Sequence, residues 1–417
     1  MDKINIHIIG VAGTMTAPLA VALQKQGHSV TGSDQDKIYP PISDNISSIP
    51  LNQPLGKIDL CIVGSSYKNF SRCFSEFEQI KSQNIPYISA TEYIAQNLIK
   101  DNSIIVTGSY GKTTISAILA HTIPNINYFF GGQSVDDKPS LVFSDNNWSI
   151  VEGDESIHGL DDKAKFLYYK TKYVILTCVN WEHKDSYQNE AENMQAYRRL
   201  VENIPSDGLL IYNPDDQNIQ SLLPFCKGKV IPYIKKDFPT TLVGKHNQEN
   251  ISAAYTLCHH LGLDFDISGF KGIKRRLEIV RQKNDILVID DFAQSPERVI
   301  TALKAVQFSY PNRRTFVYFE PHASFLRYQQ SLTEFTKIKE YIHQFILGKI
   351  KFSPNKDNRV TASNWKEYLG DKLTYIPIDT DIVEFFRINL QPNDILIHFS
   401  SGGLDGLNTL KTVYNNI

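Results

Sequence analysis

The segment from Val106 to Thr114, VTGSYGKTT, constrains the fold of this chain more than any other. It lies between an apolar run typical of a buried strand, residues 104–106, and an apolar stretch typical of a helix, residues 115–120. Glycines there let backbone N–H groups approach phosphate oxygens, and a helix N-terminus adds its positive end. The segment therefore predicts a nucleoside-triphosphate loop with the phosphate-binding residues Gly108, Gly111, Lys112, Thr113 and Thr114.

The segment departs from the common phosphate-loop pattern at one position, and it has one alternative interpretation. Val106 stands where the common G-x-x-x-x-G-K-[ST] pattern has its first glycine. A glycine-rich turn followed by a helix is the alternative interpretation. Lys112 directly before two threonines favours the phosphate loop, because the lysine can neutralise β- and γ-phosphate oxygens and a hydroxyl can bind Mg²⁺.

Composition excludes several classes of function. The 417 residues carry 43 basic and 45 acidic side chains, a net charge of −2 that argues against nucleic-acid and membrane-surface binding. No apolar run is long enough to cross a bilayer, and the N-terminus has no signal-peptide pattern. The 5 cysteines are scattered without C-x-x-C spacing, which indicates neither a zinc site nor a disulfide framework. We therefore expect a cytoplasmic protein.

The first part of the chain, residues 1–98, has the alternation of strands and helices typical of a parallel α/β domain. A strand at 6–9 precedes the turn Gly10–Thr14, a helix follows at 17–26, and a second strand at 29–34 ends on Asp34. Another strand, at 60–63, precedes the small polar turn at 64–66. This arrangement is similar to a dinucleotide fingerprint, but Gly10-x-x-Gly13 predicts only a nucleotide-like ligand.

Two further α/β domains are expected, at residues 99–280 and 281–417. In the central one, a strand ends in the acidic run Glu152-Gly153-Asp154-Glu155, and another leads to Asn180 and His183. Polar groups after parallel strands meet at one edge of a sheet, which favours a shared Mg–ATP site. In the last one, strands at 286–289, 315–319 and 395–399 run into polar turns.

The order of these motifs resembles one family along nearly the whole chain, the ATP-dependent Mur ligases of peptidoglycan assembly. The matching segments are T-G-S-Y-G-K-T-T, Glu152–Glu155, Cys178–Asp185, Gly244–Asn250, Gly272–Glu278 and Asp290-Asp291. The resemblance implies a Rossmann-like N-terminal domain, a central P-loop ATPase-like domain and a Rossmann-like C-terminal domain. It also implies an amide ligation that proceeds through an acyl phosphate, with ATP as co-substrate and Mg²⁺ as cofactor.

The resemblance assigns roles residue by residue. It assigns catalysis to Lys112, Glu152 and His183, and Mg²⁺ binding to Thr113, Glu152 and His183. Besides the loop, it assigns ATP contacts to Asn247 at the adenine, Arg276 at a phosphate and Asp291 at the ribose. It assigns the UDP-sugar to Gly10, Gly13, Thr14, Ser33, Asp34, Ser65 and Ser66, and the incoming amine to His322, Arg327 and Ser401.

Several of these residues also have a purely structural interpretation. His246 can be a polar residue at a helix start, Arg275 a solvated charge in the link between domains, and Asp290 a cap at a strand end. Gln294 and Ser295 stand where the family has histidines, a departure whose effect the sequence does not reveal.

The segments Gly27–Asp34, Lys163–Phe166 and Ser401–Gly403 look most like those of family members that attach a recycled tripeptide. Those members join L-alanyl-γ-D-glutamyl-meso-diaminopimelate to UDP-N-acetylmuramate. The alternatives are ligation of L-alanine and a non-catalytic UDP-sugar sensor. An oxidoreductase and a folylpolyglutamate-synthase-like ligase fit less well. The sequence predicts small-molecule partners and no oligomeric state.

Overall fold

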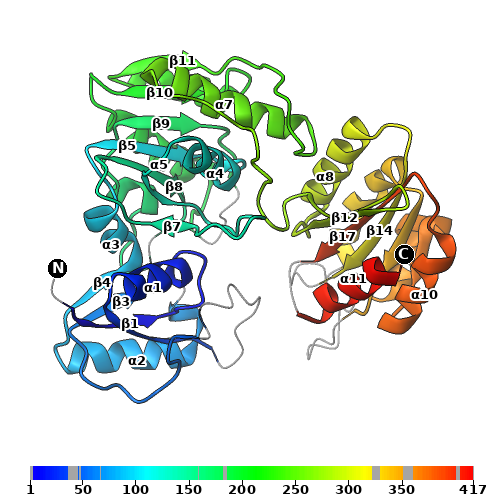
Figure 1. Cartoon of the computed structure of the whole chain (residues 1–417), viewed down its shortest axis with the longest axis horizontal. Coiled ribbons are helices and arrows are strands. Elements are labelled where there is room, and N and C mark those ends of the chain that lie inside the picture. Colours follow the sequence, from blue (N-terminus) through cyan, green and yellow to red (C-terminus); the bar gives the residue numbers. More distant parts are fainter. Residues whose placement is uncertain are drawn as a thin grey trace. The chain divides into compact units, whose positions relative to one another are not determined.

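The computed structural model describes residues 3–35, 46, 48–65, 67–157, 159–181, 186–321, 329–350, 360–400 and 404–416. The chain forms two compact units. The first unit comprises Met1–Thr240 and Asn247–Lys271, and the second comprises Thr241–His246 and Gly272–Ile417. The first unit holds two sheets and the second unit holds one (Figure 1).

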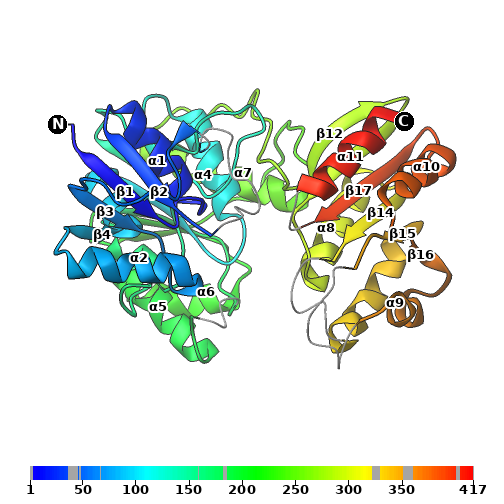
Figure 2. The ribbon, with the colours of Figure 1, turned by 90° about the horizontal axis from the view of Figure 1, so that it is seen from below.

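The N-terminal sheet is entirely parallel, with strand order β2-β1-β3-β4. Alternating side chains of its central strand β1 face two different cores: Ile6 and Ile8 pack with helix α1, and Ile9 packs with helix α2. The two helices therefore cover opposite faces of this sheet (Figures 1 and 2). The elements are β1 (Asn5–Ile9), α1 (Thr16–Lys25), β2 (Ser29–Ser33), β3 (Leu60–Val63), the 3₁₀ turn η2 (Tyr67–Asn69), α2 (Ser71–Ser82), β4 (Tyr87–Ser89) and α3 (Ala90–Asn97).

The central sheet has seven strands in the order β11-β10-β9-β5-β8-β6-β7, and all are parallel except β7, which pairs antiparallel with β6. Helices α4 and α7 lie on one face, and α5 and α6 lie on the other (Figure 2). Its elements are β5 (Asn102–Thr107), α4 (Lys112–Thr122), β6 (Asn127–Phe129), β7 (Leu141–Val142), β8 (Trp148–Gly153), η3 (Lys165–Tyr168), β9 (Tyr173–Leu176), α5 (Glu190–Glu202), β10 (Leu209–Tyr212), α6 (Gln217–Leu222), η4 (Leu223–Phe225), β11 (Lys229–Pro232) and α7 (Lys245–Leu261).

The second unit contains a six-stranded sheet in the order β12-β13-β17-β14-β15-β16, in which only β12 runs antiparallel to its neighbour. One core packs α8, η6 and α9 against one face, and another packs α10 and α11 against the other (Figure 2). Its elements are β12 (Glu278–Lys283), β13 (Ile286–Asp291), α8 (Pro296–Ser309), β14 (Arg314–Glu320), η6 (Gln329–Tyr341), β15 (Gln344–Leu347), α9 (Ala362–Leu369), η7 (Gly370–Lys372), β16 (Leu373–Tyr375), α10 (Asp379–Asn389), β17 (Asp394–Ser400) and α11 (Leu404–Asn416).

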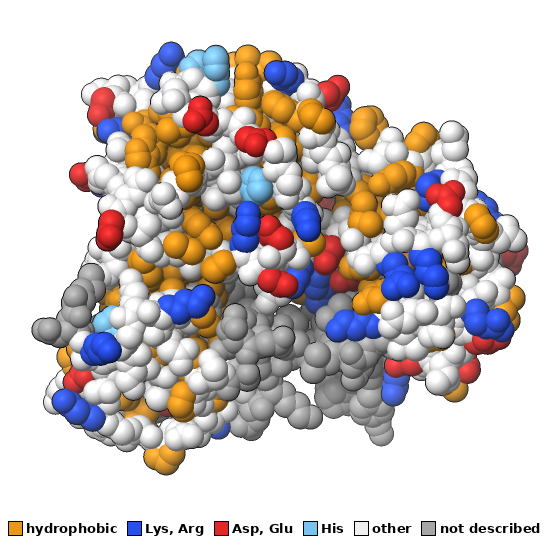
Figure 3. Space-filling view, viewed as in Figure 1, with side chains coloured by type: hydrophobic (Ala, Val, Ile, Leu, Met, Phe, Trp, Pro, Cys, Tyr) orange, Lys and Arg blue, Asp and Glu red, His pale blue; other side chains and the backbone are white. Residues whose placement is uncertain are grey.

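These three sheets confirm the predicted α/β class, and each predicted strand coincides with an observed one to within a few residues. The first two sheets share one compact unit, and the domain boundaries at 98/99 and 280/281 stay predictions. None of the helices in the described part of the chain combines the length and the apolar composition that a membrane span needs. On the face shown in Figure 3, basic and acidic side chains are interspersed with uncharged ones, as expected for a net charge of −2.

Candidate active site

The predicted phosphate loop connects β5 to α4. Gly108 and Gly111 have φ values of +123° and +86°, which favour glycine because a Cβ is strained in this region. A Cβ at Gly108 would also lie 2.2 Å from the hydroxyl oxygen of Thr177. Helix α4 begins at Lys112 without a side-chain cap, so its first N–H groups are left for other acceptors, as in phosphate-binding loops.

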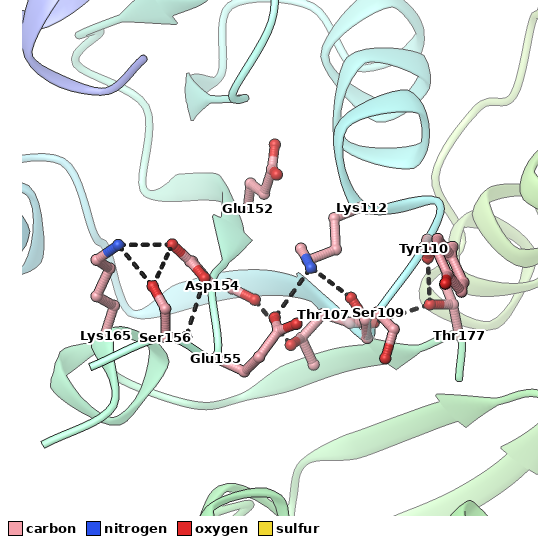
Figure 4. Close-up of polar contacts among 12 residues, drawn as sticks. Thr107, Ser109, Tyr110, Lys112, Glu152, Asp154, Glu155, Ser156, Lys165 and Thr177 are labelled. Carbon is pink, nitrogen blue, oxygen red and sulfur yellow. Dashed lines mark hydrogen bonds and ion pairs between the residues drawn. The ribbon is translucent and has the colours of Figure 1, made fainter. Parts of the chain in front are cut away.

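Lys112 points back across the loop. Its ammonium group donates to the Gly108 carbonyl at 2.6 Å and to the Glu155 carboxylate at 2.9 Å (Figure 4). Burial alone lowers the pKa of Lys112, but the carboxylates of Glu155, Asp154 and Glu152 outweigh it, so this pKa lies above its ordinary value. Lys112 is therefore charged at neutral pH, as a phosphate-binding lysine must be.

Glu152, at the end of β8, lies beside the first turn of α4. One oxygen accepts from the Thr113 hydroxyl at 3.1 Å, and the other accepts from the Gly131 backbone N–H at 2.6 Å. Burial raises the pKa of Glu152, and the charge of Lys112 opposes this effect. A carboxylate and a hydroxyl are hard oxygen donors of the kind that Mg²⁺ prefers, so this pair fits the predicted metal ion. Within the described parts of the chain, no three His, Cys, Asp or Glu side chains form a metal-binding group.

A second ion pair, between Lys165 and Asp154, lies next to Lys112, and the sequence did not predict that these two residues pair. Lys165 donates to Asp154 at 2.6 Å and to the Ser156 hydroxyl at 2.8 Å. Figure 4 shows Asp154 and Glu155 between the two lysines. Burial raises the pKa of Asp154, but the charges of Lys165 and Lys112 lower it by more, so the carboxyl group stays ionised. The acidic run, Lys112 and the segment Lys163–Phe166 were all visible in the sequence, but the pairing of the lysines with the acids was not.

Asn250 connects Asn247, the predicted adenine contact, to the phosphate loop. The Asn250 amide donates to the Asn247 side-chain oxygen at 3.1 Å. A Cβ at Gly111 would lie 2.5 Å from the Asn250 side-chain oxygen, so α7 packs directly on the loop. This contact brings Asn247 near the loop, and its contact with the base stays a prediction.

The predicted UDP-sugar residues of the first domain meet at the carboxyl ends of β1, β2 and β3. Gly10, with φ +70°, makes the turn after β1, and the Asp34 carboxylate accepts from the Ala12 backbone N–H at 2.8 Å. Thr14 is exposed and lies two residues before the first residue of α1, a helix that has no side-chain cap. The turn after β3 lies against the central domain, because a Cβ at Gly159 would come within 2.6 Å of the Ser65 carbonyl oxygen. Gly13 lies in the same turn as Gly10, and Ser33 is buried at the end of β2.

In the second unit, Asp291 is buried and Arg276 is exposed. The two Asp291 carboxylate oxygens accept from the backbone N–H groups of Leu277 and Ala293, both at 2.8 Å. Burial raises the pKa of Asp291, and the charge of Arg276 opposes this. Asp291 thus stabilises the turn before β12, and its contact with a ribose stays a prediction.

Gln294 and Ser295 stand where the family has histidines. Ser295 caps α8 by accepting from the Arg298 backbone N–H at 3.3 Å. Gln294 is buried, and its amide donates to the Ala293 carbonyl at 3.1 Å. His246 lies in the first turn of α7, as its structural interpretation predicts.

Arg275 and Asp290 differ from their structural interpretations. The Arg275 side chain is only 16% exposed, lies 3.3 Å from Asp290 and donates to the Ser400 carbonyl, so it is not a solvated charge. Asp290 does not cap its strand but binds a buried histidine, His398, at 2.8 Å. Five predicted site residues lie outside the described residues: Ser66, His183, His322, Arg327 and Ser401.

Comparisons with known proteins agree with this geometry. A family profile described as the Mur ligase middle domain matches residues 106–237, and one described as the Mur ligase glutamate ligase domain matches residues 275–402. The UDP-N-acetylmuramate–L-alanyl-γ-D-glutamyl-meso-2,6-diaminoheptandioate ligase of Haemophilus influenzae is 26% identical over 73% of this chain and 76% of its own length. The UDP-N-acetylmuramate–L-alanine ligase of Borreliella burgdorferi is 27% identical over 96% of this chain and 97% of its own.

A solved structure shows the same fold over the whole chain. The UDP-N-acetylmuramate–alanine ligase of Thermotoga maritima aligns with a TM-score of 0.77 at 18% identity, covering 99% of this chain and 98% of its own.

Proposed function

This chain belongs to the Mur ligase family, and we propose that it joins the tripeptide L-alanyl-γ-D-glutamyl-meso-diaminopimelate to UDP-N-acetylmuramate. It is an ATP-dependent amide ligase of cell-wall synthesis. The observation that carries the ATP-dependent chemistry is the Lys112 ammonium group, held in the phosphate loop beside the acidic end of β8.

In the first step, the lactyl carboxylate of UDP-N-acetylmuramate attacks the γ-phosphate of ATP, giving an acyl phosphate and ADP. Lys112 neutralises charge on the transferred phosphoryl group, which requires that it leave Glu155 for the phosphates. Thr113 and Glu152 are the described residues that would hold Mg²⁺, with His183 as the further ligand implied by the resemblance. When bound, Mg²⁺ supplies further charge neutralisation at the phosphate oxygens.

In the second step, the amine attacks the activated carbonyl, and phosphate leaves as the amide forms. Asp34 and the turns after β1 and β3 would hold the UDP-sugar, while His322, Arg327 and Ser401 would bind carboxylates of the peptide. A tripeptide has more carboxylates than alanine has, so we expect Arg327→Ala to raise the KM for tripeptide far more than the KM for ATP.

The tripeptide assignment is supported by three segments: Gly27–Asp34, Lys163–Phe166 and Ser401–Gly403. In the second segment, Lys165 makes the ion pair with Asp154 beside the ATP loop. A relative named for the tripeptide and one named for L-alanine have similar sequence identity to this chain, 26% and 27%. Sequence identity therefore does not distinguish between these two substrates.

The deciding assay gives the purified protein UDP-N-acetylmuramate and ATP with either the tripeptide or L-alanine, and measures phosphate release. Turnover with the tripeptide and none with L-alanine supports the proposal. Turnover with L-alanine alone would overturn the tripeptide assignment and leave the ligase assignment standing. Binding of UDP-N-acetylmuramate without phosphate release in any mixture would favour the non-catalytic sensor, an alternative suggested by Gln294 and Ser295.

A further inference from the structure

A buried charge network connects the three central strands of the C-terminal sheet. Asp290 on β13 and Tyr318 on β14 lie level with His398 on β17, which runs between them. All three side chains lie on the face that packs against α10 and α11, because they continue the alternation of that core. Glu320 follows two residues after Tyr318 on the same face, at the carboxyl end of β14.

His398 is the centre of this network and is fully buried. Its Nδ1 lies 2.8 Å from the Asp290 carboxylate, and its Nε2 lies 3.1 Å from the Glu320 carboxylate. The ring stacks on Tyr318 with 4.8 Å between ring centroids, and the Tyr318 hydroxyl donates to the other Glu320 oxygen at 3.1 Å. Between two ionised carboxylates, both contacts are hydrogen bonds only if both ring nitrogens carry a proton, so this geometry favours an imidazolium.

The charges of the network explain why the imidazolium is stable. Arg275, on the other side of Asp290, contributes a second cation, so two cations face two carboxylates. Burial alone lowers the pKa of His398, but hydrogen bonds to Asp290 and Glu320 outweigh it and raise the pKa to about 9. The contacts from His398 and Tyr318 therefore fix the orientation of the Glu320 carboxyl group.

Glu320 is the acid of this network that reaches the surface. Its side chain is 12% exposed, whereas Asp290 is 2% exposed and Asp291 is 7% exposed. Among the described acids at the carboxyl ends of β13, β14 and β17, Glu320 is thus the most accessible. Ligands of open α/β sheets bind outside these ends. The contacts from His398 and Tyr318 orient both oxygens of the Glu320 carboxylate, whose negative charge suits a cationic donor.

We propose that Glu320 binds the α-ammonium group of the incoming amine substrate and that His398 is the positioning residue that holds the Glu320 carboxylate. This inference rests on the proposed ligase function, but not on the choice of amine. L-alanine and the tripeptide both present the α-amino group of an alanine, which is mostly an ammonium at pH 7. An ammonium and a carboxylate form a charge-assisted hydrogen bond, which fixes the position of the substrate nitrogen. The ammonium then loses one proton to solvent, and the resulting amine attacks the acyl phosphate.

The test compares KM values for the three substrates by phosphate release, with the amine that the wild type uses. Glu320→Gln should raise the KM for the amine by about tenfold or more, because a hydrogen bond between charged groups is lost. The KM values for ATP and UDP-N-acetylmuramate should change less than about twofold. Glu320→Asp keeps the charge, so its KM for the amine should lie between those of the wild type and Glu320→Gln.

Two further variants separate positioning from a general loss of structure. His398→Gln should raise the same KM, and the double variant Glu320→Gln/His398→Gln should be no worse than Glu320→Gln, because both act through one carboxylate. Arg314→Gln is the matched control. It breaks an ion pair of 2.6 Å with Asp394 between the same strands, β14 and β17, at their opposite ends. This control should lower the melting temperature and leave the KM for the amine unchanged.

The outcomes distinguish this inference from the proposed function. An unchanged KM for the amine in Glu320→Gln would overturn the inference while wild-type turnover upholds the ligase. Equal increases in all three KM values would also overturn it, since they indicate a structural role. Wild-type protein without phosphate release would remove the proposed function and this inference together.

Discussion

The protonated His398 should make the stability of the second unit depend on pH. The pKa of His398 is raised from 6.5 to about 9, so folding stabilises the imidazolium. Because the folded-state pKa lies above the unfolded-state value, this stabilisation is complete below about pH 6.5 and is lost as the pH rises through about 9. At about 1.4 kcal/mol per pH unit, the difference corresponds to about 3 kcal/mol of unfolding free energy.

The size of this pH-dependent stabilisation depends on the groups around the His398 ring. The charged and titratable groups that contribute to the network are Asp290 and Glu320, which contact the ring, and Arg275, Glu278 and Tyr318 around them. His398 is completely buried, so solvent does not screen the two carboxylates that contact it.

The assay is urea unfolding of the wild type and His398→Gln at pH 6.5 and pH 9.5. Trp365, buried in the second unit, reports on that unit when Trp148 and Trp181 are replaced by Phe in both proteins. The wild type should exceed the variant in unfolding free energy at pH 6.5, and this excess should shrink by about 3 kcal/mol at pH 9.5. Subtracting the unfolding free energy of the variant from that of the wild type removes the contribution of groups that titrate in both proteins. An excess that stays constant between the two pH values would refute a protonated His398.

Three further predictions concern the first unit. Lys112→Ala should lower kcat by about 10²-fold or more in the phosphate-release assay, while the circular dichroism spectrum stays that of the wild type. Ligation by this variant at a near-normal rate would show that the loop takes no part in the mechanism. Gly13→Val should weaken UDP-N-acetylmuramate binding, measured by calorimetry, and leave ATP binding unchanged. The reason is that the new Cβ would lie 2.8 Å from a threonine hydroxyl at the turn. Equal loss of binding for both ligands would indicate misfolding. Gly108→Ala should abolish ATP binding, since its Cβ would lie 2.2 Å from Thr177 and its φ is +123°. The control Gly56→Ala has no atom within 4 Å of its Cβ and should bind ATP normally; equal binding by both variants would contradict the strain argument.

The strands and the phosphate loop could be predicted because their signals are local. The loop needs glycines at Gly108 and Gly111 for its left-handed backbone, and a lysine at the helix start for its charge, all within one short segment. Apolar runs bounded by small polar turns similarly predicted β1, β5, β9 and β13. The acids at the ends of β8 and β13 were visible for the same reason.

The partners of those acids were decided only by the tertiary structure. His398 lies 108 residues after Asp290 and 78 residues after Glu320, and it meets both because β17 inserts between β13 and β14. Neither the order of strands in a parallel sheet nor their register follows from local spacing, since parallel neighbours are joined by long crossovers. Lys112 likewise meets Glu155 because β5 and β8 are adjacent. The sequence by itself determined which chemical groups lie at the strand ends, and the strand order determined which of them pair.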